Sequence, residues 1–159
     1  MNPAPNNAAA RRQSALLRLS TNIAAAHDED EVYTATVEGL RDGALGYDFV
    51  SVLTVDAASG ERVLRASVGW DGGPDGYRIA EGRGLSERPL LDGEMHYSPD
   101  VAKDEHFVPG PVEGSEVDLP IIVDSEVMGI LAVESVEIDA FGREDFEILT
   151  AAAQQTGTD

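Results

Sequence analysis

Two pairs of strand-like segments, each joined by a tight turn, limit the folds that this chain can adopt. Residues 49–55 and 61–70 flank the turn sequence DAASG; the first is rich in β-branched side chains, and the second alternates polar with apolar ones. Residues 117–123 and 127–134 flank a tight Asp-Ser turn, and the second of these is apolar enough to be a central strand. Such runs separated by short turns are typical of antiparallel hairpins. The sequence therefore predicts an antiparallel sheet built around two hairpins.

Three segments with helical periodicity lie outside the hairpins. Residues 8–26 are rich in alanine, and a second helix is expected directly after them with Asp28 or Asp30 as its N-cap. A last helix is expected from about Gly142 and is unfinished at the end of the chain, so we expect the natural protein to continue. The apolar positions that share a face in the three helices are, in chain order, Leu16, Leu19, Ile23 and Ala26, then Tyr33, Val37, Leu40 and Ala44, then Phe146, Leu149 and Ala153.

The middle of the chain is irregular. The sequence WDGGPDG at residues 70–76 breaks regular structure, residues 77–80 are expected to form a short edge strand, and residues 85–91 a short helical piece. Residues 95–97 are expected to be extended, and a polar loop of seventeen residues follows at 98–114. Loops of that length are uncommon and often functional, so this loop is a candidate for a functional role.

The order of these elements predicts an α+β fold within the wider α/β class. We expect a central antiparallel sheet of about five or six strands, with the terminal helices on one face and the irregular middle on the other. A chain of 159 residues has the size of one domain, and residues 8–159 are interpreted as that domain. Residues 1–7, MNPAPNN, are expected to be a disordered tail.

The composition excludes several classes of function. The chain has no cysteine, which excludes disulfides, thiolate catalysis and Cys-ligated metal centres. No stretch approaches the ~20 apolar residues of a membrane span, and the N-terminus lacks the apolar run of a secretion signal. The protein is therefore expected to be cytoplasmic and not to bind membranes. The sequence contains neither a Ser-His-Asp arrangement nor an HExxH cluster, so no such motif indicates an enzyme. No cofactor is identified by the sequence.

We interpret the large excess of acidic residues as an adaptation to the solvent and not as a sign of a particular substrate. With 30 acidic and 11 basic residues the net charge is −19, which disfavours contact with nucleic acid phosphates. We interpret the acids, Asp118 among them, as a salt-adapted, halophilic surface, since a strongly charged surface is mainly a solubility device. An ordinary acidic bacterial protein is the alternative.

Three longer segments resemble the GAF domain family. They are EGRGLSERPLLDGEMHYSPDVAKDEHF, SEVDLPIIVDSEVMGILAVES and DAFGREDFEILTAAAQQ, and the resemblance covers about residues 14–155. Its most specific part is a Ser-Glu pair before a Pro-Ile strand, followed by a Gly-containing strand and a Phe-x3-Asp helix start. The resemblance implies a central antiparallel sheet with N- and C-terminal helices on one face. It also implies a ligand pocket on the other face, roofed by the irregular middle.

Individual residues distinguish the branches of this family. The free-methionine sulfoxide reductase branch has a catalytic cysteine shortly after the glycine pair, and this chain has none. Glu116 matches a glutamate of that branch, whereas Ala132 and Glu134 replace its two aspartates. Glu134-Ser135 also stand where the cyclic-nucleotide branch has Asn-Lys. Attachment of a bilin would need a cysteine, and His96 and His106 are haem-ligand candidates by location alone. The resemblance therefore implies a sensory, regulatory GAF domain.

The candidate ligand-binding residues lie between Gly82 and Glu116. The Ser-Glu pair either holds a ligand's amine or caps the entry to a strand, and both interpretations stay open. Gly82-x-Gly84 suits a phosphate cradle or, more often, a simple turn. His106 is a ligand contact or a loop surface residue. The full candidate set is Glu116, Ser115, Tyr97, Asp100, His106, Phe107, Gly84 and Leu85.

Two functions fit these residues. The first is a small-molecule-sensing regulatory domain of a sensor kinase or transcription regulator. The second is a dimerisation module with a degenerate, filled pocket. A cavity of ~300 Å³ or more favours the first, and ordinary core packing favours the second. Apolar stripes at both ends predict a homodimer through the terminal helices. The residues of these stripes are Leu16, Leu19, Ile23, Leu149 and Ala152.

Overall fold

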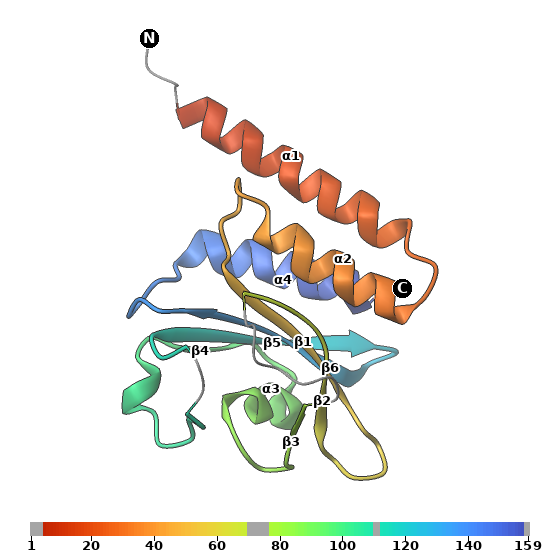
Figure 1. Ribbon diagram of the computed structural model, residues 1–159, viewed down its shortest axis with the longest axis vertical. Coiled ribbons are helices and arrows are strands. Elements are labelled where there is room, and N and C mark those ends of the chain that lie inside the picture. Colours follow the sequence, from red (N-terminus) through yellow and green to blue (C-terminus); the bar gives the residue numbers. More distant parts are fainter. Residues whose placement is uncertain (1–4, 70–76, 110–111, 158–159) are drawn as a thin grey trace.

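The chain folds around one six-stranded sheet with the strand order β3-β2-β1-β6-β5-β4, in which all neighbouring strands pair antiparallel (Figure 1). This computed structural model describes residues 5–69, 77–109 and 112–157. Its elements are α1 (Pro5–Ala24), α2 (Glu29–Arg41), β1 (Phe49–Val55), β2 (Arg62–Val68), β3 (Arg78–Ile79), the 3-10 turn η1 (Leu85–Glu87), α3 (Arg88–Asp92), β4 (His96–Ser98), the 3-10 turn η2 (Val101–Lys103), β5 (Ser115–Val123), β6 (Glu126–Ser135) and α4 (Arg143–Gly157). The expected fold class is confirmed.

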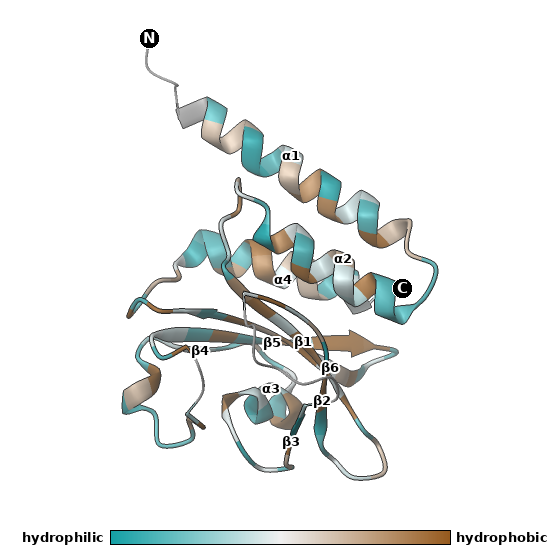
Figure 2. Ribbon diagram, in the orientation of Figure 1, coloured by the Kyte–Doolittle hydropathy of each residue, from teal (hydrophilic) through white to brown (hydrophobic). Residues whose placement is uncertain are grey.

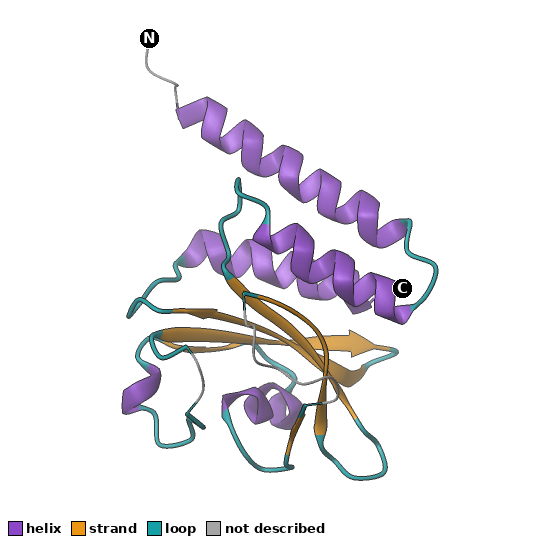
Figure 3. Cartoon of the chain, in the orientation of Figure 1, coloured by secondary structure: helices purple, strands orange, loops and turns teal. Residues whose placement is uncertain are grey.

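The helices α1, α2 and α4 form two layers on one face of the sheet. α2 and α4 pack directly on the strands, α1 packs on α2 and α4, and α3 lies on the opposite face (Figures 1 and 3). Figure 2 shows hydrophobic residues along the central strands, while the helices alternate between hydrophobic and hydrophilic positions. Leu40, Val50, Leu119, Leu131 and Leu149 belong to the fully buried core between these layers. Burial of one face of each helix therefore supplies the main packing energy of the fold.

Local sequence sets where the helices begin. The Asp28 side chain accepts a hydrogen bond from the Glu31 amide at 2.9 Å and is the N-cap of α2, one of the two candidates for that role. At the start of α4, Asp145 accepts a hydrogen bond from the Gly142 amide at 2.8 Å and a second from the Tyr47 hydroxyl at 2.7 Å. α1 begins at Pro5, three residues before the expected start at Ala8.

The apolar stripes of the terminal helices lie inside the chain, which corrects the basis of the predicted dimer. Leu19, Ile23, Leu149 and Ala152 are each at most 3% exposed and belong to the main core. Leu16 is partly buried against the same core. Helical periodicity identifies the face that packs, but it does not distinguish a partner within the chain from one in a second copy.

The two hairpins are present, and the strand pairing of each contains one register shift. β5 and β6 are joined through Asp124 and Ser125, whose φ angles of 50° and 68° match the turn that favours the right-handed strand twist. The pairing of β1 with β2 shifts register between Val52 and Leu53. The shift turns Arg65 toward α2, where it lies 5.3 Å from the ring centroid of Tyr33. Strict alternation over 61–70 is therefore wrong, because one bulged residue moves the later side chains to the other face.

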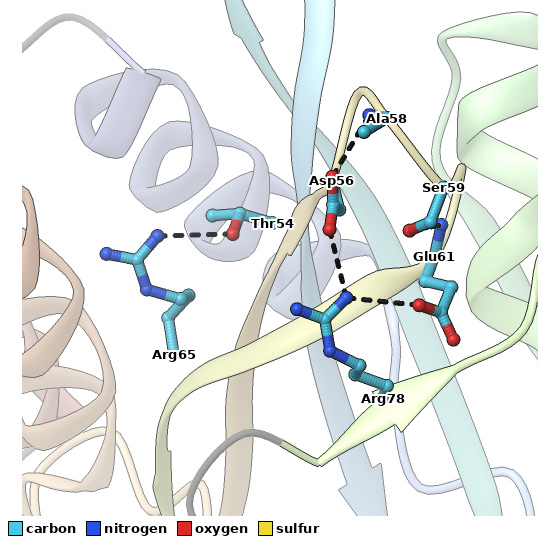
Figure 4. Close-up of polar contacts among 7 residues, drawn as sticks. All are labelled: Thr54, Asp56, Ala58, Ser59, Glu61, Arg65 and Arg78. Carbon is cyan, nitrogen blue, oxygen red and sulfur yellow. Dashed lines mark hydrogen bonds and ion pairs between the residues drawn. The ribbon is translucent and has the colours of Figure 1, made fainter.

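A short edge strand continues the sheet beyond the first hairpin. Arg78 on β3 donates to Asp56 at 3.0 Å and to Glu61 at 3.1 Å, on either side of the β1–β2 turn (Figure 4). These contacts attach β3 to the hairpin although it pairs over only two residues. The segment expected to break regular structure, residues 70–76, lies outside the described residues together with Trp70.

Candidate functional site

A small cavity lies between the sheet and the irregular middle of the chain, on the face away from the terminal helices. Its volume is about 110 Å³. The strands contribute Ser51, Leu53, Leu64, Glu116, Ala132 and Glu134. The irregular middle of the chain, which we call the cover, contributes Tyr77, Ile79, Gly84, Leu85, Ser86, Phe107, Val108 and Pro109. The lining is largely apolar, with carboxyl groups from two adjacent strands. The cavity is smaller than the ~300 Å³ typical of sites for larger ligands, so a molecule that fits it as it stands has few heavy atoms.

Three carboxyl groups gather on the strands at one end of this cavity, and we call them the carboxyl cluster: Glu116, Asp118 and Glu134. Glu116 and Asp118 are two residues apart on β5 and therefore share a face, and Glu134 on β6 is the cross-strand partner of Glu116. Glu116 is 7% exposed and Asp118 1%. Hydrogen bonds join Glu116 to both of the other carboxyls. A hydrogen bond between two carboxyls requires a proton on one of them.

Burial and mutual repulsion raise the pKa of every member of the carboxyl cluster. Desolvation raises the pKa of Glu134 to about 9, and the nearby charge of Glu116 adds to this effect. Desolvation also raises the pKa of Asp118 to about 7 and that of Glu116 well above its usual range. For Asp118, the hydrogen bond with Glu116 and the charges of Arg62 and Arg88 act in the opposite direction. The cluster therefore holds protons at neutral pH.

Arg62 fastens the cover over the cavity. Its side chain is fully buried, and it donates hydrogen bonds to the Ser86 hydroxyl, to the Ala80 carbonyl at 2.9 Å and to the Arg83 carbonyl. It also forms an ion pair with Glu87 at 3.2 Å. All of these partners lie in the segment from Ala80 to Glu87, so one strand residue positions the first half of the cover.

A second arginine fastens the other half of the cover. Arg88 on α3 donates to Asp104 at 2.8 Å, and Asp104 also accepts from the His106 amide at 3.0 Å. These contacts join α3 to the loop that carries Phe107. Burial of this pair from water is partial, with 29% of the Arg88 side chain and 14% of the Asp104 side chain exposed. The two arginines thus hold the cover at separate points.

Four of the eight predicted binding residues lie together at the cavity: Glu116, Phe107, Gly84 and Leu85. Gly84 has a φ of +82° directly before η1. This conformation favours glycine, so the turn before η1 is sufficient to explain why glycine stands at this position. Leu85 is buried and closes the cavity from the cover side.

The other four predicted residues do not line the cavity, which corrects the expectation that all eight converge there. Ser115 precedes Glu116 in β5, so its side chain lies on the opposite face, where its hydroxyl donates to the Glu137 carbonyl at 2.7 Å. Tyr97 donates to Asp139 at 2.7 Å and packs against Phe146. Asp100 directly precedes η2 at its N-cap position, and His106 is exposed.

Sequence reasoning missed Asp118, Arg62 and Ser86 as residues of this region. Asp118 was interpreted as part of a solvated surface, and its 1% exposure corrects this. The alternation Glu116-x-Asp118 inside an otherwise apolar strand was the available signal, because it places two acids on one face. Arg62 stands at the start of a strand with no local feature that predicts burial.

Within the described ranges, no group of three or more His, Cys, Asp or Glu side chains is arranged to hold a metal ion. Among the helices of that same part of the chain, none combines the length and apolar character that a membrane crossing requires.

Comparisons with known proteins agree with this architecture. The model of the GAF domain family matches residues 26–158. No curated protein matches the chain. The GAF domain of a phosphoenolpyruvate-protein phosphotransferase from Coxiella burnetii is similar in structure, with a TM-score of 0.85, 23% identity, and coverage of 96% of this chain and 93% of that one.

Two further solved structures are similar over most of their length. Free methionine-R-sulfoxide reductase from Neisseria meningitidis, in complex with its substrate, has a TM-score of 0.83 and 24% identity, covering 99% of this chain and 92% of that one. Residues 122 to 287 of a methyl-accepting chemotaxis protein have a TM-score of 0.76 and 26% identity, covering 91% and 94%. The same fold therefore occurs in proteins with different activities, and the fold alone does not select among them.

Proposed function

Because the chain belongs to the GAF domain family, we propose that it is a regulatory module that senses a small molecule for a signal-transduction protein in the cytoplasm. The observation that carries this proposal is the carboxyl cluster at a cavity of about 110 Å³. Burying three acids next to one another costs stability, since each loses hydration and repels the others. Such a cost is commonly retained where the groups have a functional role.

The position of the cavity suits a sensor. Its floor includes Glu134, and β6 ends at Ser135, one short connection before α4. The polar contacts of Arg62 and Arg88 hold its cover, together with buried apolar side chains such as Leu85 and Val101. A ligand that contacts both layers can therefore shift the cover and the strand that leads to the last helix. The output domain would be a kinase or a transcription regulator.

The proposal assigns no catalytic role. The reductase branch of the family is expected to use cysteine, and this chain has none. Ser51 and Ser86 line the cavity beside the carboxyl cluster, but the described residues that line it include no histidine or lysine to act as their general base.

A dimerisation module without a ligand is the second candidate, and the small cavity volume favours it. In either function we propose a homodimer through the terminal helices. The buried stripe residues cannot form its contact, whereas Leu17 on α1 is 69% exposed and faces away from the core. A single exposed leucine provides a modest contact, so the dimer is expected to need further residues of α1.

Substitution of Glu116 tests the sensing function. We expect a library of small metabolites to contain compounds that raise the melting temperature of the wild-type protein by several degrees, because a ligand that binds only the folded state stabilises it. Glu116→Gln keeps the shape of the side chain and should abolish this shift, while its melting temperature without ligand stays close to that of the wild type.

Two controls make the result decisive. Glu126→Gln, on an exposed position at the start of β6, should keep the ligand-induced shift. A large drop in the melting temperature of ligand-free Glu116→Gln and Glu116→Ala would make Glu116 a structural residue, and the sensing proposal would lose its principal contact.

A further inference from the structure

The charges of Arg62 and Arg88 lower the pKa of Asp118, but within the described residues neither arginine forms an ion pair with a member of the carboxyl cluster. The two terminal nitrogens of the Arg62 guanidinium contact the cover, through Ser86, two carbonyls and Glu87, whereas its buried Nε has no hydrogen-bond partner. Arg88 is paired with Asp104 at 2.8 Å. Asp104 adds a further negative charge near Glu116. The cluster therefore keeps its own protons instead of exchanging them for an internal cation.

One acceptor within the cluster is left without a partner. The Oδ1 atom of Asp118 is buried and forms no hydrogen bond, although Asp118 is hydrogen-bonded to Glu116. A buried carboxylate oxygen without a donor costs free energy comparable to a lost hydrogen bond. Asp118 does not line the cavity, so the carboxyls of Glu116 and Glu134 are the members of the cluster that a ligand can contact.

We propose that the cavity binds a small organic cation through Glu116 and Glu134, and that each bound cation displaces a proton from the carboxyl cluster into solvent. This inference rests on the proposed sensing function and names the chemical class of its ligand. The ammonium group of the ligand donates hydrogen bonds to the carboxylate oxygens. The proton that had been shared between two carboxyls leaves, so one positive charge enters as one departs. No covalent bond forms or breaks in the ligand.

The remaining lining defines the rest of this ligand. Leu53, Leu64, Phe107 and Val108 give the cavity an apolar wall beside the acids. A cation that carries a short hydrocarbon chain satisfies both surfaces, and the volume of about 110 Å³ restricts the chain to a few carbons. A neutral molecule of the same shape would fill the wall without relieving the carboxyls.

Asp118 acts in this exchange as a positioning residue, since it does not line the cavity. Its hydrogen bond with Glu116 fixes one side of that carboxyl and leaves the other side toward the cavity. Its charge also opposes ionisation of Glu116. Asp118→Asn removes this charge but keeps the shape, so the proton of Glu116 should leave at lower pH in the variant.

Calorimetric titration with a matched pair of probes tests the proposal. n-Butylammonium and 1-butanol have the same length and differ in charge. In the intact chain at pH 7, we expect n-butylammonium to bind with release of about one proton, read from the difference in heat between two buffers of different ionisation enthalpy. Its affinity should rise about tenfold per pH unit between pH 6 and 8. 1-Butanol should bind at least tenfold more weakly.

Variants separate a binding role from a structural one. Glu134→Gln should weaken n-butylammonium at least tenfold, and Glu126→Gln should leave its affinity unchanged. Asp118→Asn should keep binding but move the pH range of proton release downward, which a purely structural role would not do. The proposal is overturned if neither probe binds, if both bind equally, or if n-butylammonium binds without proton release. A neutral metabolite that binds and depends on Glu116 would overturn this inference and leave the sensing function intact.

Discussion

Replacement of Glu134 by glutamine should flatten the dependence of stability on pH. The pKa of Glu134 rises from 4.5 to about 9 on folding, chiefly through desolvation. Between these values the folded protein holds a proton that the unfolded chain has lost. The contribution of this retained proton to the free energy of unfolding is therefore fully present below the unfolded pKa and is lost as the pH rises toward the folded pKa. Each pH unit in this range lowers the free energy of unfolding by about 1.4 kcal/mol per retained proton.

The range accessible to experiment makes this effect large. From pH 5.5 to 8.5, one retained proton corresponds to about 4 kcal/mol. Because the three carboxyls interact, the protons belong to the carboxyl cluster, and Asp118 adds to the slope at the acidic end, up to its pKa of about 7. Glutamine resembles the protonated acid in shape and charge. Glu134→Gln should thus equal the wild type within about 1 kcal/mol at pH 5.5 and exceed it at pH 8.5.

Urea denaturation across this pH range, at constant 1 M KCl, measures how the free energy of unfolding changes with pH for the wild type and for Glu134→Gln. The high salt suppresses long-range repulsion among surface acids, whose contribution would otherwise also change with pH. Glu126→Gln serves as the matched control, because that residue is exposed in the same strand. If the wild type shows no fall in stability between pH 5.5 and 8.5, or if Glu134→Gln has the wild-type slope, the carboxyls are hydrated and the buried cluster is refuted.

Three further predictions concern salt, the cover and association. Raising KCl from 0.1 to 1 M should raise the melting temperature, because 30 acids against 11 bases repel one another and the Debye length falls from about 10 Å to about 3 Å; an unchanged melting temperature would remove the basis of the halophilic interpretation. Arg62→Met should destabilise the fold by about 3 kcal/mol and speed amide hydrogen exchange in residues 78–87 more than in α4, since it leaves Glu87 without its cation; equal acceleration in both regions would contradict its role as the anchor of the cover. Sedimentation at micromolar concentration should show a dimer for the wild type and a monomer for Leu17→Glu, and a wild-type monomer would count against association through α1.

The sequence was informative where structure depends on local features. Asp28 as a cap, the turn at Asp124 and Ser125 and the strand from Phe49 to Val55 all follow from residue type and periodicity within a few positions. The same pattern predicted the apolar strand from residue 117, whereas β5 begins at Ser115 and includes Glu116. These elements are sufficient to predict the layers of the fold.

Features that depend on contacts between distant segments of the chain could not be predicted from the local sequence. The bulge at Arg65 changes which side chains of β2 face the cavity, and nothing in its local sequence marks it. Arg62 is buried because the segment from Ala80 to Glu87 folds back onto it. In a chain of net charge −19, the position of Asp118 two residues after Glu116 in an apolar strand indicates which face it shares, but its burial depends on how the cover packs.

A native mass spectrum of the protein purified from its own host tests the central claim most directly. A sensor that binds a small molecule in the cavity should show a population heavier than the bare chain by the mass of a small compound, and Glu116→Gln purified in the same way should lack it. The cavity of about 110 Å³ requires that added mass to be small. A wild-type spectrum with the bare chain alone, unchanged when host extract is added back, would contradict the sensing function and favour a module that only associates.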